Sequence, residues 1–469
     1  MRQDSSKRTR MMLCATVSSV VLIGAWSTVA PALAGTFSDF TPLASSVAAG
    51  SLPESAPLSL PSGFSQKSIA ANDLGPQNGG VKLGDNWDMI TSNENGPSAG
   101  RYLFTPYENF TPTAGVLRLD LQTGVAKTIV PEGTKGFAAG DASRWTPFGT
   151  YLTAEESWDS TSSTKGRLFE INNPLADPAS ISFLNKDVIP RVAHEGLAFD
   201  KQNNMYFVDE FNGGSIYKYT STTPTDGSTF FTAGQTFVLK VGAGANSEVT
   251  GAATWVPITD ANGNALAGIT TKVIDGVTVI DGRAAADQVL GTGFGRPEDL
   301  EIKTLKDGSQ RLFFAATTNS KVFAIDLTNA TNADVKLFVS QATANKLTGL
   351  AVGTELLNTD NLAIDAEGNI YIIEDQPAGF SDVWFAYDKD GDGVAESIAR
   401  WASLSTLGSE PTGLYFDPFQ PHVAYINVQH SSSDVDRMMK IAVPEPGSLA
   451  LLLPGLLGLA GLARRKRNA

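Results

Sequence analysis

The chain has almost no cysteine and very little histidine. Its 469 residues include one cysteine, Cys14, and three histidines, His194, His422 and His430. Because Cys14 lies in a segment that we expect to be removed, the exported protein has no disulfide, no thiolate nucleophile and no cysteine metal ligand. Three histidines without a Gly-x-Ser-x-Gly motif argue against a Ser-His-Asp hydrolase. His194-Glu195 also lacks the second histidine of a zinc protease motif.

Long hydrophobic runs are confined to the two ends of the chain. At the N-terminus, Lys7, Arg8 and Arg10 precede an apolar stretch over residues 11–25. The small-x-small sequence at residues 32–34 is typical of a cleavage site, so residues 1–34 are predicted to be a signal peptide removed by signal peptidase. An uncleaved membrane anchor is the alternative. The mature chain then begins at Gly35.

At the C-terminus, residues 444–446 read Pro-Glu-Pro, residues 449–462 are apolar, and residues 464–467 are all basic. The apolar segment is too short for a comfortable permanent span. This three-part tail, residues 444–469, resembles the PEP-CTERM sorting signal that an exosortase processes in Gram-negative bacteria. The resemblance implies transient membrane anchoring and delivery to the periplasm, cell surface or extracellular matrix. A plain C-terminal anchor is the alternative.

Positive charge is scarce between these ends. The whole chain has a net charge of −14, and the signal and the tail each contribute +3, so the segment between them carries −20. Such a surface repels nucleic acid and anionic lipid, and it attracts divalent cations. We therefore expect no nucleic-acid partner.

A short strand pattern recurs in the segment between the two ends. Each copy begins near a small or polar residue and alternates apolar with polar side chains, as half-buried strands do. The copies follow one another at close to 50 residues, except for one gap of about 106. They predict an all-β fold, a six-bladed β-propeller over residues 35–443, with an insertion at 221–290 between blades three and four. The copies are residues 115–120, 166–171, 214–219, 321–326, 382–387 and 436–441.

A second repeat carries acidic residues. Glu195, Glu298 and Asp360 each lie two positions before the first leucine of a strand. A fourth copy has Thr412 at this position and Glu410 two residues earlier. Because equivalent positions of successive blades face one central channel, these acids are expected to converge.

The strands that follow the turns also end in polar residues. The series places Glu155 or Glu156, and Glu374 or Asp375, near the same channel; we take Glu156 and Glu374 as the ligands. Crowded carboxylates repel one another unless cations lie between them. Oxygen ligands from several blades suit Ca²⁺, which accepts six to eight oxygens in loose geometry. The alternative is that each acid caps a loop.

Two further features of the sequence are charged: Arg296, close to these acids, and a turn at residues 388–393 that follows a strand motif. Arg296 precedes Glu298 by two residues and is placed either to grip an anion or to form a salt bridge with the acids. Residues 388–393, Asp-Lys-Asp-Gly-Asp-Gly, match the opening of a calcium loop. Ala399 stands where an EF-hand has its twelfth-position glutamate. A plain acidic turn is therefore the alternative for this loop.

These segments together resemble the PhoX-type alkaline phosphatase family. The resemblance implies a propeller with calcium and iron in its channel that hydrolyses phosphate monoesters. It also implies that Glu195, Glu298, Asp360 and Glu374 are metal ligands and that Arg296 holds the phosphate. The matching segments are residues 145–156, 194–196, 296–299, 360–361, 373–375, 400–402 and 410–413.

The chain departs from this family at Ala154. Active members carry an iron-binding cysteine in the Leu-Thr-x-Glu-Glu segment, where this chain has Ala154. Strand alternation from Leu152 points Ala154 in the same direction as Glu156. Calcium is therefore the expected cofactor and iron is doubtful. The sequence predicts an exported phosphoesterase with a calcium-rich channel. The alternatives are a non-catalytic, calcium-stabilised propeller of the cell surface or biofilm matrix, and a lactonase-like hydrolase.

Overall fold

The computed structural model describes residues 35–73, 75, 80–160, 162–244, 247–375 and 380–443. The predicted signal peptide and sorting tail lie outside these residues. The described part contains one α-helix, α1 (Gly282–Gln288), and it includes no helix long and apolar enough to cross a membrane. The 3-10 turns are η2 (Thr134–Gly136), η3 (Pro178–Ser180), η4 (Thr317–Asn319) and η5 (Gly353–Glu355).

The remaining regular structure is β-sheet, and nearly all of its strand pairs are antiparallel. Two four-stranded sheets come first along the chain. The first contains β3 (Thr91–Ser92), β4 (Tyr102–Pro106), β5 (Val116–Asp120) and β6 (Val125–Val130). The second contains β7 (Arg144–Trp145), β8 (Tyr151–Ala154), β9 (Leu168–Ile171) and β10 (Phe183–Asn185).

A nine-stranded sheet occupies the middle of the chain and consists of two four-stranded parts joined by β16 (Gly251–Pro257), which pairs with β15 on one side and β23 on the other. The first part contains β11 (Leu197–Phe199), β12 (Met205–Val208), β14 (Ile216–Ser221) and β15 (Gly234–Val241). The second part contains β20 (Pro297–Thr304), β21 (Gln310–Ala316), β22 (Lys321–Asp326) and β23 (Asn332–Val339).

A six-stranded sheet, a four-stranded sheet and two strand pairs complete the fold. The first sheet contains β25 (Thr359–Ile364), β26 (Ile370–Glu374), β27 (Asp382–Tyr387), β28 (Ser397–Leu404), β1 (Leu58–Ser59) and β24 (Ala344–Asn345). The second contains β29 (Glu410–Phe416), β30 (Val423–Gln429), β31 (Arg437–Ala442) and β2 (Ser65–Ala71). The separate pairs are β13 (Asn212–Gly214) with β19 (Phe294–Gly295), and β17 (Thr271–Ile274) with β18 (Val277–Ile280).

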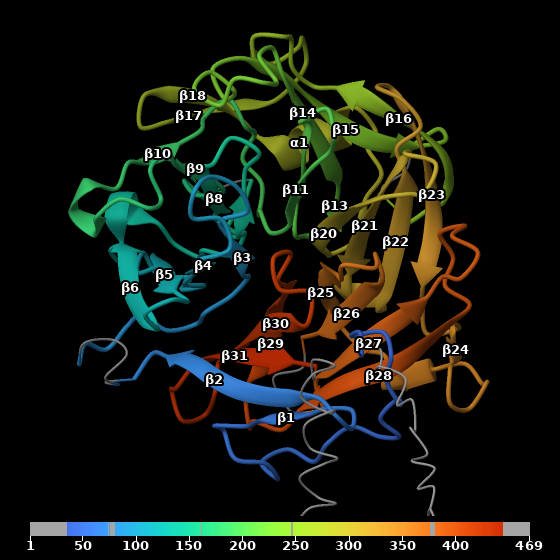
Figure 1. Cartoon of the computed structure of the whole chain (residues 1–469). Helices are drawn as coiled ribbons and strands as arrows, with labels where there is room; N and C mark the ends of the chain where they lie inside the picture. Colours follow the sequence, from blue (N-terminus) through green and yellow to red (C-terminus); the bar gives the residue numbers. More distant parts are fainter. Residues whose placement is uncertain are drawn as a thin grey trace, which may run out of the picture. The chain divides into compact units, whose positions relative to one another are not determined.

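The core lies between neighbouring sheets. Each cluster of buried hydrophobic side chains draws its members from two successive sheets or from the two four-stranded parts of the nine-stranded sheet. Strand β21 illustrates the pattern: Leu312 and Phe314 pack toward the part that contains β11, whereas Phe313 and Ala315 pack toward the sheet of β25. Since side chains alternate along a strand, such strands are buried on both faces. The sheets accordingly stand around a common centre, as in a propeller (Figure 1).

The two ends of the described chain meet in one sheet. The N-terminal strand β2 pairs antiparallel with the C-terminal strand β31, from Ser65 opposite Ala442 to Ala71 opposite Arg437. Figure 1 shows β2, in blue, beside β31, in red. Backbone pairing between distant parts of the sequence removes an exposed edge and joins the last sheet to the beginning of the chain.

The six predicted strand motifs coincide with β5, β9, β14, β22, β27 and β31, each the third strand of its four-stranded unit. The predicted all-β class is confirmed. The segment at 221–290 is more regular than an added loop. Its first strand is β15, which pairs with β14 as the next strand of the same sheet. Within this segment, the elements beyond the four-stranded pattern are β16, β17, β18 and α1.

Candidate metal centre

A cavity of about 50 Å³ is lined almost entirely by polar groups. Arginine is the only cation among its lining residues, and ten of them are carboxylates. The lining residues are Asp88, Glu108, Asp141, Glu156, Glu195, Glu210, Arg296, Glu298, Asp360, Asn361, Asp375, Glu410 and Gln429.

One set of these residues comes from the beginnings of the innermost strands. Glu195 lies two residues before β11, and Glu298 and Asp360 are the second residues of β20 and β25. Both β20 and β25 carry a register shift at this point, between Pro297 and Leu300 and between Thr359 and Leu362. A bulge redirects the side chain at an extra residue, which explains why equivalent acids turn out of the sheets.

A second set comes from the ends of the strands that follow the innermost strand in their sheets. Glu156 and Glu210 lie two residues beyond β8 and β12, Asp375 follows β26 directly, and Gln429 ends β30. In an antiparallel pair, the end of one strand lies beside the beginning of its neighbour. The two sets therefore reach the same edge of every sheet and line one cavity.

Burial of this many carboxylates is electrostatically unfavourable when no cation lies among them. Desolvation raises the pKa of Glu298 to about 8, and the neighbouring Glu210 adds to the effect. Desolvation raises the pKa values of Asp141, Glu195 and Asp360 as well, and nearby carboxylates act in the same direction. Glu298 would therefore hold its proton at neutral pH unless a cation replaced it.

Several cavity carboxylates also have a buried oxygen without a hydrogen-bond partner among the described residues. Buried polar atoms are ordinarily satisfied, so a group of such atoms points to a missing ligand. Oxygens of Glu195, Glu210 and Glu298 lie within 4.8 Å of one another, which is close enough to share a cation. The acids with such an orphaned oxygen are Asp141, Glu156, Glu195, Glu210 and Asp375. This donor set of hard oxygens fits a divalent cation such as calcium.

Arg296 lies directly against the acids. Its Nε is 2.6 Å from Glu210 Oε1 and 3.1 Å from Glu298 Oε1. Its backbone adopts a left-handed conformation, with φ of 57°, and its carbonyl accepts a hydrogen bond from Thr317 N. Burial acts to lower the pKa of Arg296, but Glu298 and Glu210 outweigh it and raise the pKa above its usual value. The guanidinium is permanently charged, and 40% of the side chain is exposed.

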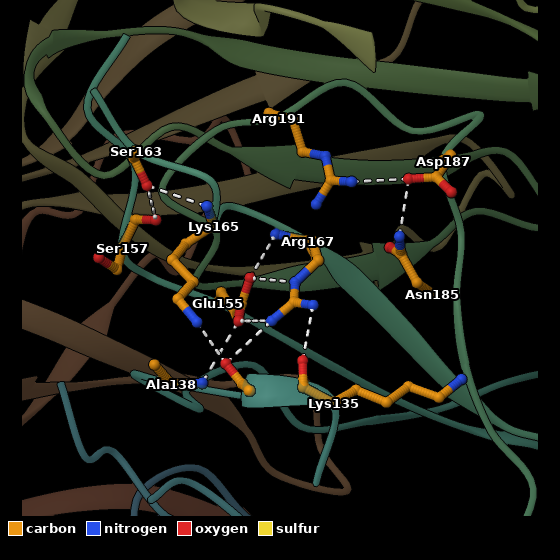
Figure 2. A network of polar contacts seen from close by, with 11 residues as sticks. Lys135, Ala138, Glu155, Ser157, Ser163, Lys165, Arg167, Asn185, Asp187 and Arg191 are labelled. Carbon is orange, nitrogen blue, oxygen red and sulfur yellow. Dashed lines mark hydrogen bonds and ion pairs between the residues drawn. The ribbon is translucent and has the colours of Figure 1, made fainter. Parts of the chain in front are cut away.

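The adjacent acids Glu155 and Glu156 have different environments. Figure 2 shows Glu155 enclosed by donors, with Arg167 Nε 2.8 Å from Oε2 and Arg167 Nη2 2.5 Å from Oε1. The amides of Ala138 and Arg167 donate to the same carboxylate. Glu155 is therefore satisfied by the protein, whereas Glu156 lines the cavity with one oxygen unpartnered.

A similar division separates Glu374 from Asp375. Glu374 does not line the cavity, because its oxygens accept hydrogen bonds from Leu357 N at 2.9 Å, Asp382 N at 3.0 Å and Trp384 Nε1 at 2.9 Å. Asp375, the next residue, lines the cavity and has an orphaned oxygen. Glu374, the last residue of β26, therefore stabilises neighbouring segments of the fold, and Asp375 reaches the cavity.

Ala154 lies in the hydrophobic core. It is fully buried in the cluster that contains Leu152, Leu168 and Leu197. Ala154 is the last residue of β8, and Glu155 continues the pairing through a bridge to Gly140. The carbonyl of Ala154 accepts a hydrogen bond from Asp141 N at 3.1 Å, so the residue lies beside the segment that carries this cavity acid.

Four lining acids were missed by the sequence analysis: Asp88, Glu108, Asp141 and Glu210. Asp88 lies two residues before Ile90, just as Glu195 lies two residues before Leu197. Glu108 lies two residues beyond β4, in the position that Glu156 occupies after β8. The repeat phase could have identified both. Asp141 could not be found in this way, because no leucine follows it at the same spacing.

The fold and this site define an all-β, propeller-like protein with an acidic cavity suited to metal ions. Comparison with known families is consistent with this description. The alkaline phosphatase PhoX family matches residues 110–432, and the chain belongs to this family. The PEP-CTERM protein-sorting motif matches residues 442–467 and indicates export and processing by an exosortase. No curated protein matched the chain.

Solved structures resemble the chain only remotely. A virginiamycin B lyase from Staphylococcus aureus has 11% identity and a TM-score of 0.41, covering 81% of this chain and 100% of its own. A protein of unknown function from Bacteroides thetaiotaomicron has 14% identity and a TM-score of 0.43, with coverages of 81% and 76%. An aldose sugar dehydrogenase from Streptomyces coelicolor has 12% identity and a TM-score of 0.38, with coverages of 82% and 100%. At these scores, no activity of these proteins transfers to the chain.

Proposed function

We propose that the chain is an exported phosphomonoesterase whose acidic cavity holds calcium and whose Arg296 binds the phosphate. The observation that carries this proposal is the set of buried, unpartnered carboxylate oxygens in a member of the PhoX family. Such oxygens are costly unless a cation occupies the cavity, because a buried acceptor without a donor loses its hydration without compensation.

The ligands that we propose come from both sets of strand ends. Glu195, Glu298 and Asp360 come from the beginnings of inner strands, and Glu156 comes from beyond the end of β8. Asp375 takes the place first assigned to Glu374, since Glu374 already accepts three hydrogen bonds. Bound divalent cations neutralise the phosphate and polarise its oxygens. No soft donor appears in the lining, which favours calcium over iron.

Arg296 is positioned to hold the substrate at the opening of the cavity. Both of its ion pairs use Nε, and this leaves the two Nη groups to donate to oxygens of a phosphate. Planar donors of this kind suit a tetrahedral anion and strengthen as charge develops on its oxygens. The left-handed backbone at Arg296 fixes the direction of the side chain, and Glu210 and Glu298 restrain it further.

The proposed scaffold is a six-bladed propeller, and the hydrophobic clusters between successive four-stranded units support this number. A closed ring brings the acids of several sheets to one axis. The sorting motif at residues 442–467 supports transient anchoring and release at the surface of a Gram-negative cell, where millimolar calcium is available.

A second candidate function is a calcium-stabilised surface propeller without catalysis. Ala154 favours it, because this position offers no donor atom and lies in the hydrophobic core. In that case the cavity would hold cations only to join the sheets, and Arg296 would only balance the charge of Glu210 and Glu298.

Turnover and metal content of the purified protein distinguish the two. We expect hydrolysis of a phosphomonoester at alkaline pH that depends on Ca²⁺, and elemental analysis with calcium in excess of iron. Arg296→Gln should lower kcat/KM by about 10²–10³-fold, the usual cost of losing a donor to a transition-state oxyanion. The bound calcium should remain in this variant. Full calcium binding without turnover in the unmodified protein would favour the structural function instead.

A further inference from the structure

A second group of acids lies on the turn between β27 and β28, outside the central cavity. Its sequence, Asp-Lys-Asp-Gly-Asp-Gly at residues 388–393, places aspartates at alternate positions. Carboxylate oxygens of Asp388, Asp390 and Asp392 lie within 4.8 Å of one another. Since exposed acids are common without an ion, this proximity alone does not establish a site.

The environment of Asp388 provides the second observation. Only 7% of its side chain is exposed, although the other two aspartates are open to solvent. Its Oδ1 is buried and has no hydrogen-bond partner among the described residues. The other oxygen, Oδ2, lies 3.6 Å from Arg311 Nη1. One buried oxygen of the cluster therefore has no hydrogen-bond donor, although Arg311 forms an ion pair with the other oxygen of the same carboxylate.

The loop is also held in place by the neighbouring sheet. Arg311 of β21 donates from Nη1 to Gly391 O at 2.9 Å, and Lys336 of β23 donates from Nζ to Asp392 O at 2.5 Å. Within the loop, Asp390 and Asp392 each accept a backbone amide on one oxygen, Oδ1, at 3.1 and 2.8 Å. The second oxygen of each remains available to a ligand.

We propose that Asp388, Asp390 and Asp392 form a surface calcium site, distinct from the cavity of the proposed function. The three aspartates occupy the first, third and fifth positions of a calcium loop, and Glu396 stands at the ninth. Ala399 at the twelfth position supplies no bidentate ligand. With one strong ligand missing and Arg311 nearby, the site has the affinity of extracellular modules, with a Kd of about 10⁻⁴–10⁻³ M.

Calcium binding by the purified protein, followed by equilibrium dialysis from 0.01 to 10 mM, tests this site. The double variant Asp390→Asn/Asp392→Asn should lose one weakly bound calcium per chain and keep its phosphatase activity and its tighter ions. Asp260→Asn serves as the matched control, because Asp260 accepts amides of its own turn in the same way but lies outside the cluster.

Limited trypsin digestion locates the effect. Lys389 is exposed within the loop, and we expect millimolar Ca²⁺ to slow cleavage after it at least tenfold in the unmodified protein and in Asp260→Asn. The protection should be absent in the double variant. An unchanged number of bound calcium ions in the double variant, or equal cleavage with and without calcium in the unmodified protein, would overturn the proposal. Both results are independent of whether the cavity is catalytic.

Discussion

The central cavity and the turn at residues 388–393 are both acidic, but they are built in opposite ways. The cavity collects residues from several sheets, and six of its ten acids are buried. The turn draws three aspartates from one short segment, and two of them are exposed. In both places a buried oxygen lacks a partner.

The difference lies in what balances the charge. Arg311 and Lys336 reach the turn from the neighbouring sheet and hold its backbone, so the loop keeps its form without an ion. In the cavity one arginine stands among ten acids, and burial raises the pKa of Glu298 to about 8. Cations should therefore be necessary for the stability of the cavity, whereas the turn keeps its conformation without them. The predictions below test this contrast.

Chelation should produce the largest effect. Removal of divalent cations with EGTA should lower the melting temperature by about 5 °C or more, since one site filled at 100 times its Kd contributes about 2.7 kcal/mol of stability. Thermal melts with EGTA and with 5 mM Ca²⁺ measure the difference. Glu298→Gln should retain only a small part of this calcium response, and Asp390→Asn/Asp392→Asn should retain most of it. Equal losses in the two variants would contradict the contrast.

The metal-free protein should also become less stable as the pH rises. In the folded state the pKa of Glu298 is about 8, above its usual value of 4.5. The folded protein therefore binds this proton more tightly than the unfolded chain does. Its contribution to stability is complete below about pH 4.5 and is lost as the pH rises through 8. Urea unfolding at pH 6 and pH 8.5 should show the loss in EGTA and a smaller one in Ca²⁺, where cations replace the protons. A pH-independent stability in EGTA would contradict it.

The same contrast explains how much the sequence could predict. The turn at 388–393 was fully visible in the sequence, because all of its acids are local. The strands were predictable from their alternation, and Glu195, Glu298 and Asp360 from their shared phase. Asp141 was not predictable because no leucine follows it at the repeat spacing, and the choice of Asp375 over Glu374 depends on donors from β27 and from the segment before β25. Trp384 and Leu357, which satisfy Glu374, lie in segments that give no sign of this contact.

Single substitutions of the neighbouring acids Glu374 and Asp375 should distinguish a calcium ligand from a residue that stabilises the fold. Asp375→Asn should weaken calcium binding and lower turnover by roughly 10–100-fold or more, because it removes charge from the cavity. Glu374→Gln should instead cost about 1–3 kcal/mol of unfolding free energy, since its new NH₂ group would face buried donors. Calcium titration and urea unfolding of both variants measure the two effects. If Glu374→Gln lost calcium while Asp375→Asn kept it, Glu374 would be the ligand after all.

The smallest effect is expected at Ala154, where the chain departs from active members of its family. It belongs to the hydrophobic cluster that contains Leu152, Leu168 and Leu197, and it is not among the residues that line the cavity. Ala154→Cys should therefore add a buried thiol that costs about 1–3 kcal/mol through overpacking and binds no iron. Iron analysis after expression with added iron, with Ala154→Ser as the control, tests this. One iron per chain in the cysteine variant alone, with a rise in turnover, would mean that β8 lies close enough to the acids for a thiolate to join them. Ala154 would then be the position at which this chain lost an iron ligand, and its side chain would face the cavity and not the hydrophobic core.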